Sequence, residues 1–138
     1  MKNCPQCGAD NDKIICEQVF HTILSMEPDS PKLQSEHFKT VACYIIQHPA
    51  IYTDEAIKAL VSALRDNLNH NVSVSEILKR HSRIFEGTKR VRKNEGAAFV
   101  QKKWSMTIRD CCVTNDCEST SDNIVKWAKS IVNDWGAV

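Results

Sequence analysis

Cys4 and Cys7 are separated by two residues and followed by Gly8, which is the Cys-x-x-Cys-Gly pattern of a zinc knuckle. Two thiolates at this spacing on a tight turn can face one metal ion, and glycine permits the backbone conformation that points amide N–H groups at sulfur. The alternatives are two incidental cysteines or a redox pair. A redox Cys-x-x-Cys pair starts a helix after a strand, and no strand is predicted before Cys4. The pattern therefore favours a metal site.

A structural zinc ion takes four ligands, and Cys16 is the natural third because it lies nine residues beyond Cys7. It lies in the first turn of a helix predicted over 14–26. Prolines 28 and 31 form a short connection to a second helix over 33–47, so we expect the two helices to be antiparallel. The start of the first helix then lies beside the end of the second, where His48 precedes Pro49. We predict a Zn²⁺ site made by Cys4, Cys7, Cys16 and His48.

His37 is the alternative fourth ligand. It precedes His48 by eleven residues, close to three helical turns, so both share a helix face with Tyr44 between them. The antiparallel arrangement places His37 closer to Ile23 than to Cys16. His37 is then a partner of the site, a member of a separate polar pocket, or the ligand in place of His48. The cysteine-rich donor set favours zinc and leaves iron open.

Helical periodicity predicts the elements that must position these residues. Thr53 is a suitable cap for a third helix, with Asp54 and Glu55 in its first turn. A fourth helix is expected over 74–85 with Ser73 or Ser75 as cap, and a brief one over 107–112. Ser121 or Asp122 is the expected cap of the last helix, whose apolar positions recur at helical spacing: Ile124, Trp127, Ala128, Ile131 and Trp135.

These elements predict an all-α fold, a single small helical domain of about five to six helices with an N-terminal zinc knuckle. We divide the chain into a metal knuckle (1–16), a helical core (17–85), a basic irregular loop (86–104) and C-terminal helices (105–138). A length of 138 residues suits one domain with a real core. No apolar run is long enough to cross a membrane and no secretory signal is visible, so we expect the cytoplasm.

The seven cysteines form an odd set, which fits a thiolate metal site plus free thiols better than a disulfide framework. Cys111, Cys112 and Cys117 form another cysteine group, which could be a second metal site. Adjacent cysteines rarely bind one tetrahedral ion together, and no histidine lies nearby in sequence. We interpret them as free, partly buried thiols.

Residues 79–103 are locally basic, and Phe99 and Trp104 offer faces on which bases could stack. A nucleic-acid-binding module is therefore one hypothesis. The net charge of +1 argues against it, because dedicated nucleic-acid binders carry a larger basic excess. We favour a solvated loop.

No catalytic motif is present, and no catalytic residue is predicted. The enzyme hypothesis is a zinc ion with an open position near His37, Tyr44 and His48, which needs only three protein ligands. The favoured hypothesis is a zinc-stabilised binding or regulatory module of unknown partner, with oligomerisation left open.

The chain resembles the bacterial domain of unknown function family 5946. The resemblance rests on the knuckle with Cys16, on the segment His37-x-x-Thr-Val-x-x-Tyr-x-x-Gln-His-Pro49, and on the closing stretch Val125–Trp135. It covers both ends of the chain well and the middle poorly. Members of the family usually have an acidic residue where this chain has Ala42, and tend to have a histidine where it has Leu60. The resemblance therefore implies the fold and the metal, names no activity, and puts any second site that uses those two positions in doubt.

Overall fold

The computed structural model describes residues 4, 6–9, 15–48, 52–69, 72–77, 79, 104–111 and 117–136. The elements in these ranges are helical, and no strand occurs among them. No helix in the described part of the chain has the length and apolar character needed to cross a membrane. The prediction of a small all-α domain is confirmed.

The first helix, α1, spans Cys16–Met26. The backbone N–H of Ile15 donates to Gln18 Oε1 over 3.1 Å, which satisfies one amide ahead of the first turn. The helix buries Val19 and Ile23 and is followed by a short 3₁₀ turn, η1, over Glu27–Asp29.

The predicted helix over 33–47 is two helices. Helix α2 spans Pro31–Ser35, where the Ser30 hydroxyl oxygen accepts from the Leu33 N–H at 3.2 Å, and α3 spans His37–Gln47. Glu36 separates them with φ −100° and ψ 5°, outside the helical region. No glycine or proline occurs there, so the sequence contains no signal for the break.

Helix α4 spans Asp54–Asn69 and begins as predicted. The Thr53 hydroxyl oxygen accepts from the Ala56 N–H at 3.1 Å, which is the expected cap. Residues 74–77 are helical, with the Ser73 hydroxyl accepting from the Glu76 N–H at 3.2 Å. Of the predicted helix 74–85, the part beyond 77 lies outside the described residues except for Lys79.

The closing helix, α7, spans Cys117–Gly136 and starts before the predicted cap. Ser121 and Asp122 both lie inside it, so the cap prediction is wrong. Ser121 is buried, and Asp122 instead pairs with Lys32 of α2 at 3.0 Å. The brief predicted helix over 107–112 is a 3₁₀ turn, η2, over Ile108–Asp110.

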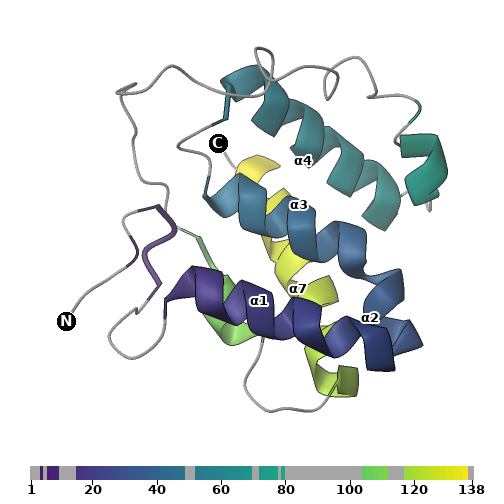
Figure 1. The fold of residues 1–138 in the computed structure, drawn as a ribbon. Helices are drawn as coiled ribbons and strands as arrows, with labels where there is room; N and C mark the ends of the chain where they lie inside the picture. The colour runs from purple at the N-terminus through teal and green to yellow at the C-terminus, as the bar shows by residue number, and fades with distance from the viewer. Residues whose placement is uncertain are drawn as a thin grey trace.

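Helix α3 is central to the fold. It packs against α4 and α7, and α1 lies antiparallel beside it, as the short connection predicted (Figure 1). Helix α1 also contacts η2. The core is continuous across these helices and contains Trp127, Ile131, Leu64 and Ile46.

A buried polar contact fixes α3 against α7. The Gln47 side chain is fully buried, its amide nitrogen donates to the Met106 carbonyl at 2.6 Å, and its oxygen accepts from Trp127 Nε1 at 3.0 Å. Trp127 was expected to be a core residue, and it is 0% exposed.

Most of the basic segment 79–103 lies outside the described residues, so the division at 86–104 remains a prediction.

Candidate metal centre

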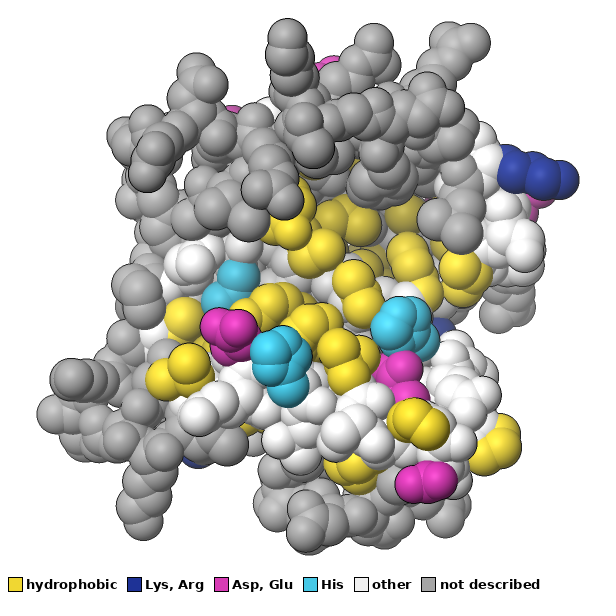
Figure 2. All heavy atoms as spheres, in the orientation of Figure 1, with side chains coloured by type: hydrophobic (Ala, Val, Ile, Leu, Met, Phe, Trp, Pro, Cys, Tyr) yellow, Lys and Arg dark blue, Asp and Glu magenta, His cyan; other side chains and the backbone are white. Residues whose placement is uncertain are grey.

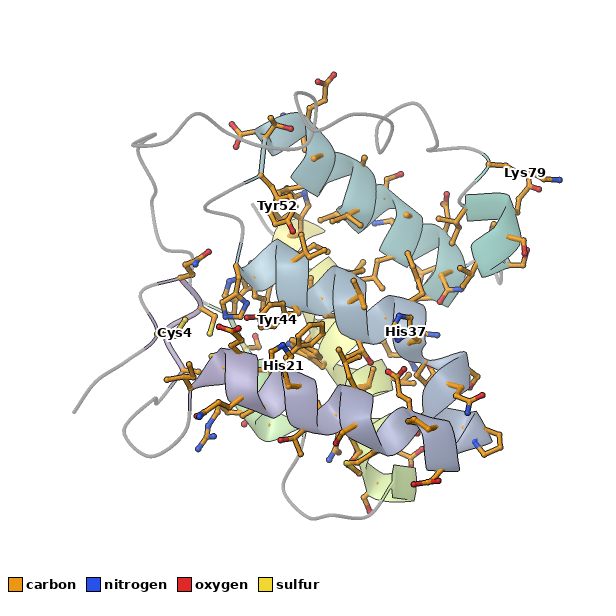
Figure 3. The ribbon with its side chains drawn as sticks, in the orientation of Figure 1. Cys4, His21, His37, Tyr44, Tyr52 and Lys79 are labelled. Atoms are coloured by element: carbon orange, nitrogen blue, oxygen red, sulfur yellow. The ribbon has the colours of Figure 1, made fainter. Side chains whose placement is uncertain are left out.

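The four predicted ligands come together at the end of the α1–α3 pair. One donor atom from each of Cys4, Cys7, Cys16 and His48 lies within 4.8 Å of the others. Cys4 lies beside the C-terminal end of α3, whereas His37 lies at the opposite end of that helix (Figure 3). The three cysteines are 4–5% exposed, so the cluster is nearly closed to solvent.

The knuckle has the backbone geometry that its sequence predicts. The Cys7 N–H points at Cys4 Sγ over 3.5 Å, and the Gly8 N–H donates to the Cys4 carbonyl at 2.9 Å. The Cys4 N–H donates to the Ala9 carbonyl at 2.7 Å and closes the turn. Gly8 has φ 83°, in the left-handed region where a side chain is costly. These contacts hold both sulfur atoms on one side of the turn.

Cys16 is the first residue of α1, so its sulfur lies at the N-terminal end of that helix. Cys7 Sγ and Cys16 Sγ are 3.6 Å apart. The hydrogen bond with Cys16 lowers the pKa of Cys7 to about 4, against the opposing effect of burial. The same bond raises the pKa of Cys16, so the pair shares one proton when no metal is bound.

His48 presents one ring nitrogen to the cysteines. Its Nδ1 lies 2.7 Å from the Tyr44 carbonyl, which can only accept, so Nδ1 carries the proton and Nε2 the lone pair. Nε2 is buried and has no hydrogen-bond partner among the described residues. A buried nitrogen lone pair without a donor is costly unless something binds it, and metal-ligating histidines typically donate their other N–H in this way.

Two aromatic rings support His48. Tyr44 stacks on His48 with ring centroids 4.3 Å apart, and Phe20 stacks on Tyr44 at 4.2 Å and 7° between planes. The stack joins α1, which begins at Cys16, to the end of α3, which His48 follows directly. Burial, with the nearby charges of Glu17 and the cysteines, raises the pKa of Tyr44 to about 12, so its hydroxyl keeps its proton at neutral pH.

The donor set fits zinc. A tetrahedral ion with Zn–S bonds of about 2.3 Å has sulfur atoms about 3.8 Å apart, close to the 3.6 Å between Cys7 and Cys16. Three cysteines and one histidine are a common structural zinc set, and the orphaned His48 Nε2 is a suitable fourth donor. The residues present therefore fit the ion that the sequence predicts.

His37 is not in the cluster. Its Nδ1 lies 2.8 and 3.0 Å from the two carboxylate oxygens of Glu27, at the other end of α1. Of the three roles that the sequence allowed for His37, this one is membership of a separate polar site. Helical periodicity did not identify Glu27 as its partner. The sequence also did not assign Gln47 its buried role, because its two partners lie 59 and 80 residues away along the chain.

Cys43 and Cys111 are not part of this cluster. Cys43 and Cys111 are buried free thiols, and burial raises the pKa of Cys43. Cys111 Sγ contacts the carbonyls of Thr107 and Asn123 at 4.0 and 3.9 Å, which is a thiol in a packed core. Cys112 and the Cys117 side chain lie outside the described residues.

The family of unknown function DUF5946 matches residues 2–136, nearly the whole chain. The chain belongs to this family. No curated protein and no solved structure matches the chain. The DUF5946 match covers the middle of the chain as well as the two ends on which the resemblance rested.

Two positions of this DUF5946 chain depart from the pattern expected for the family. Ala42 is 1% exposed on α3, and Leu60 is 7% exposed on α4. Both are apolar side chains in the core cluster. Neither can supply a metal ligand, so these two positions add no second site in this chain.

Proposed function

We propose that the chain is a zinc-binding helical module with a closed structural site formed by Cys4, Cys7, Cys16 and His48. One observation carries the proposal. The buried Nε2 of His48 has no hydrogen-bond partner among the described residues, and it lies within 4.8 Å of the donor atoms of three cysteines. A zinc ion would satisfy that nitrogen and remove the repulsion between the thiolates.

The position of the cluster supports a structural role. The knuckle contributes two ligands, the start of α1 one, and the end of α3 one. One bound ion would therefore cross-link the knuckle and the start of α1 to the end of α3, which is distant from both in sequence. Four protein donors fill a tetrahedral zinc ion, which is the arrangement of structural sites, whereas catalytic zinc keeps an open position.

The enzyme hypothesis has less support. It used His37 and Tyr44 as proton-transfer or binding groups beside an open zinc position. His37 pairs with Glu27, and Tyr44 is held between Phe20 and His48 with its pKa raised to about 12. Neither geometry favours proton exchange with a metal-bound water.

The nucleic-acid hypothesis rests on residues 79–103, of which Lys79 alone lies in the described ranges. It predicts that binding to an oligonucleotide falls steeply with salt. Instead of nucleic-acid binding, we propose a binding or regulatory module in the cytoplasm. The zinc ion would stabilise its fold.

The test is metal content per chain, measured by mass spectrometry on protein purified without a metal-affinity tag. We expect about one zinc per chain, because a single four-ligand tetrahedral site holds one ion. His48→Ala should lower zinc affinity by at least about tenfold, whereas the matched change His37→Ala should leave it unchanged. The two variants are matched because each removes one imidazole, His37 at the start of α3 and His48 directly after its end.

If the protein contains iron and not zinc, the proposed metal is wrong but the proposed ligands are unaffected. Equal zinc affinity in wild type and His48→Ala would remove His48 from the site and reopen the fourth position. No metal in the wild type would overturn the proposal.

A further inference from the structure

A groove lies directly beside the metal cluster. Its volume is about 310 Å³, near the lower end for small-molecule sites. Among the described residues it is lined by side chains from the knuckle, α1, α3 and the residues before α4: Gln6, Phe20, Val41, Tyr44, Ile45, His48 and Tyr52. His48 therefore belongs both to the cluster and to the wall of the groove.

The lining is apolar and aromatic. Figure 2 shows hydrophobic side chains gathered into a band across this face, with histidines beside it and the visible lysine and arginine side chains at the margin. In the stick view, Tyr52 lies on the α4 side of the end of α3, and Tyr44 lies between α1 and α3 (Figure 3). A ligand with an apolar body fits this lining.

The aromatic stack determines which part of Tyr44 a ligand can reach. Phe20 and His48 both stack on the Tyr44 ring, at centroid distances of 4.2 and 4.3 Å and with interplanar angles of 7° and 26°. Two rings at those distances cannot share one face, so they cover opposite faces of Tyr44. Tyr44 then contributes its ring edge to the groove. The positive edge of one ring attracts the negative face of another, so an aryl group can lie across this edge.

Among the residues that the structure describes, acidic side chains neighbour the groove. Glu17 lies one helical turn before Phe20, and its carboxylate acts electrostatically on Tyr44. Asp54 and Glu55 follow Tyr52 by two and three residues and are exposed. None of the described lining residues is a lysine or arginine. The groove therefore repels anions and favours a cationic group at its rim.

A bound zinc ion with its ligands would add to this field. Three thiolates and one neutral imidazole around a divalent ion leave one net negative charge next to the groove. This contribution rests on the proposed function, whereas that of Glu17 does not. From these observations the geometry points to a binding site for a small arylalkyl ammonium ion, with the aryl group over the Tyr44 edge and the ammonium toward Glu17.

The test uses three probes with the same phenylethyl body: 2-phenylethylammonium, 2-phenylethanol and 3-phenylpropionate. Each is titrated into the zinc-loaded full chain at about pH 8, where histidine side chains in general carry little charge. Binding is followed by calorimetry and by the NMR signals of the tyrosine rings. We expect the ammonium probe to bind at least about fivefold more tightly than the alcohol, and the carboxylate to show no saturable binding.

Two variants sharpen the test. Glu17→Gln should weaken the ammonium probe by about two- to fivefold and leave the alcohol unchanged. Asp29→Asn, an equal loss of charge at the other end of α1, should change neither. Tyr52→Leu should weaken the ammonium and alcohol probes alike, because it removes part of the wall that contacts their shared body.

Zinc content is measured on the same samples, which separates the two proposals. Zinc present with equal binding of all three probes, or with no binding at all, overturns the ammonium site and leaves the metal proposal standing. Ammonium preference that depends on Glu17 in protein without zinc supports the ligand site and overturns the metal proposal.

Discussion

Gln47 and His48 are adjacent in sequence, yet they serve opposite sides of the end of α3. Gln47 enters the core, where both ends of its amide have partners on Met106 and Trp127. His48 turns toward the knuckle, where Nδ1 has a partner and Nε2 has none among the described residues. The first pattern is that of a residue that stabilises packing, and the second is that of a ligand. Hydrogen-bond satisfaction separates the two roles where sequence proximity cannot.

Metal removal should have the largest effect on the His48 side. Treating the wild type with a strong chelator should lower Tm by about 10 °C or more, since tight binding to the folded state alone contributes several kcal/mol. Calorimetry with and without chelator measures the shift. Cys16→Ser should already show the lowered Tm, and chelator should lower it no further. An unchanged wild-type Tm would contradict a structural role for the ion.

Gln47→Leu tests the role of the Gln47 side chain in core packing. It leaves the buried Trp127 N–H without its partner, at about 1–3 kcal/mol, and the part-buried Met106 carbonyl without its own at a smaller cost. Denaturant unfolding should show a loss of about 2–4 kcal/mol, with zinc content unchanged. Adding Trp127→Phe removes one of the orphaned groups, so the double variant should lose less than the sum of the single ones. Loss of zinc in Gln47→Leu would show that the two sides are coupled.

The Tyr44 ring lies on the His48 side, and its removal should have a smaller effect than either of these changes. Tyr44→Leu keeps the backbone carbonyl that orients His48 but removes the ring between Phe20 and His48. We expect about tenfold weaker zinc binding in competition with a chromophoric chelator. Tyr44→Phe keeps the stack and should bind zinc as the wild type does. Weakening in both variants would assign the effect to the hydroxyl instead.

The smallest effect concerns the pH dependence of the metal-free protein. The pKa of Cys7 is lowered from 9.0 to about 4, so its thiolate stabilises the fold fully above pH 9.0 and loses this contribution as pH falls to about 4. The pKa of Cys16 is raised, so its contribution is present below 9.0 and is lost at higher pH. Stability should therefore rise between about pH 4 and 9 and fall above it.

Tm of the zinc-free, reduced protein across this range measures the profile. Cys7→Ser serves as the reference, because other groups titrate in both proteins and cancel in the difference. A wild-type curve parallel to that of Cys7→Ser would show that the two thiols share no proton.

Features with local causes were predictable from the sequence. The knuckle follows from two cysteines and a glycine within five residues, and the start of α4 follows from Thr53 and the acidic residues after it. The proximity of Cys16 and His48 also followed, because a short connection forces two helices to be antiparallel. The prediction that these residues bind zinc awaits the metal measurement.

Features that depend on distant partners were not predictable. The break at Glu36 occurs at a residue that ordinarily continues a helix, and Ser121, a good cap by type, lies buried inside α7. His37 and His48 share a helix and were hard to rank by spacing alone. Their roles differ because Glu27 lies at one end of α3 and the cysteines at the other.

Residue type and short-range spacing are thus sufficient for the helical class and the knuckle, because turns, caps and helix periods act within a few residues. Tertiary structure decided which polar groups have partners: Gln47 in the core, His37 on Glu27, and His48 Nε2 facing the thiols. It also placed the groove beside the cluster. These outcomes depend on the packing of helices that are distant in sequence, and that packing sets the environment of each side chain.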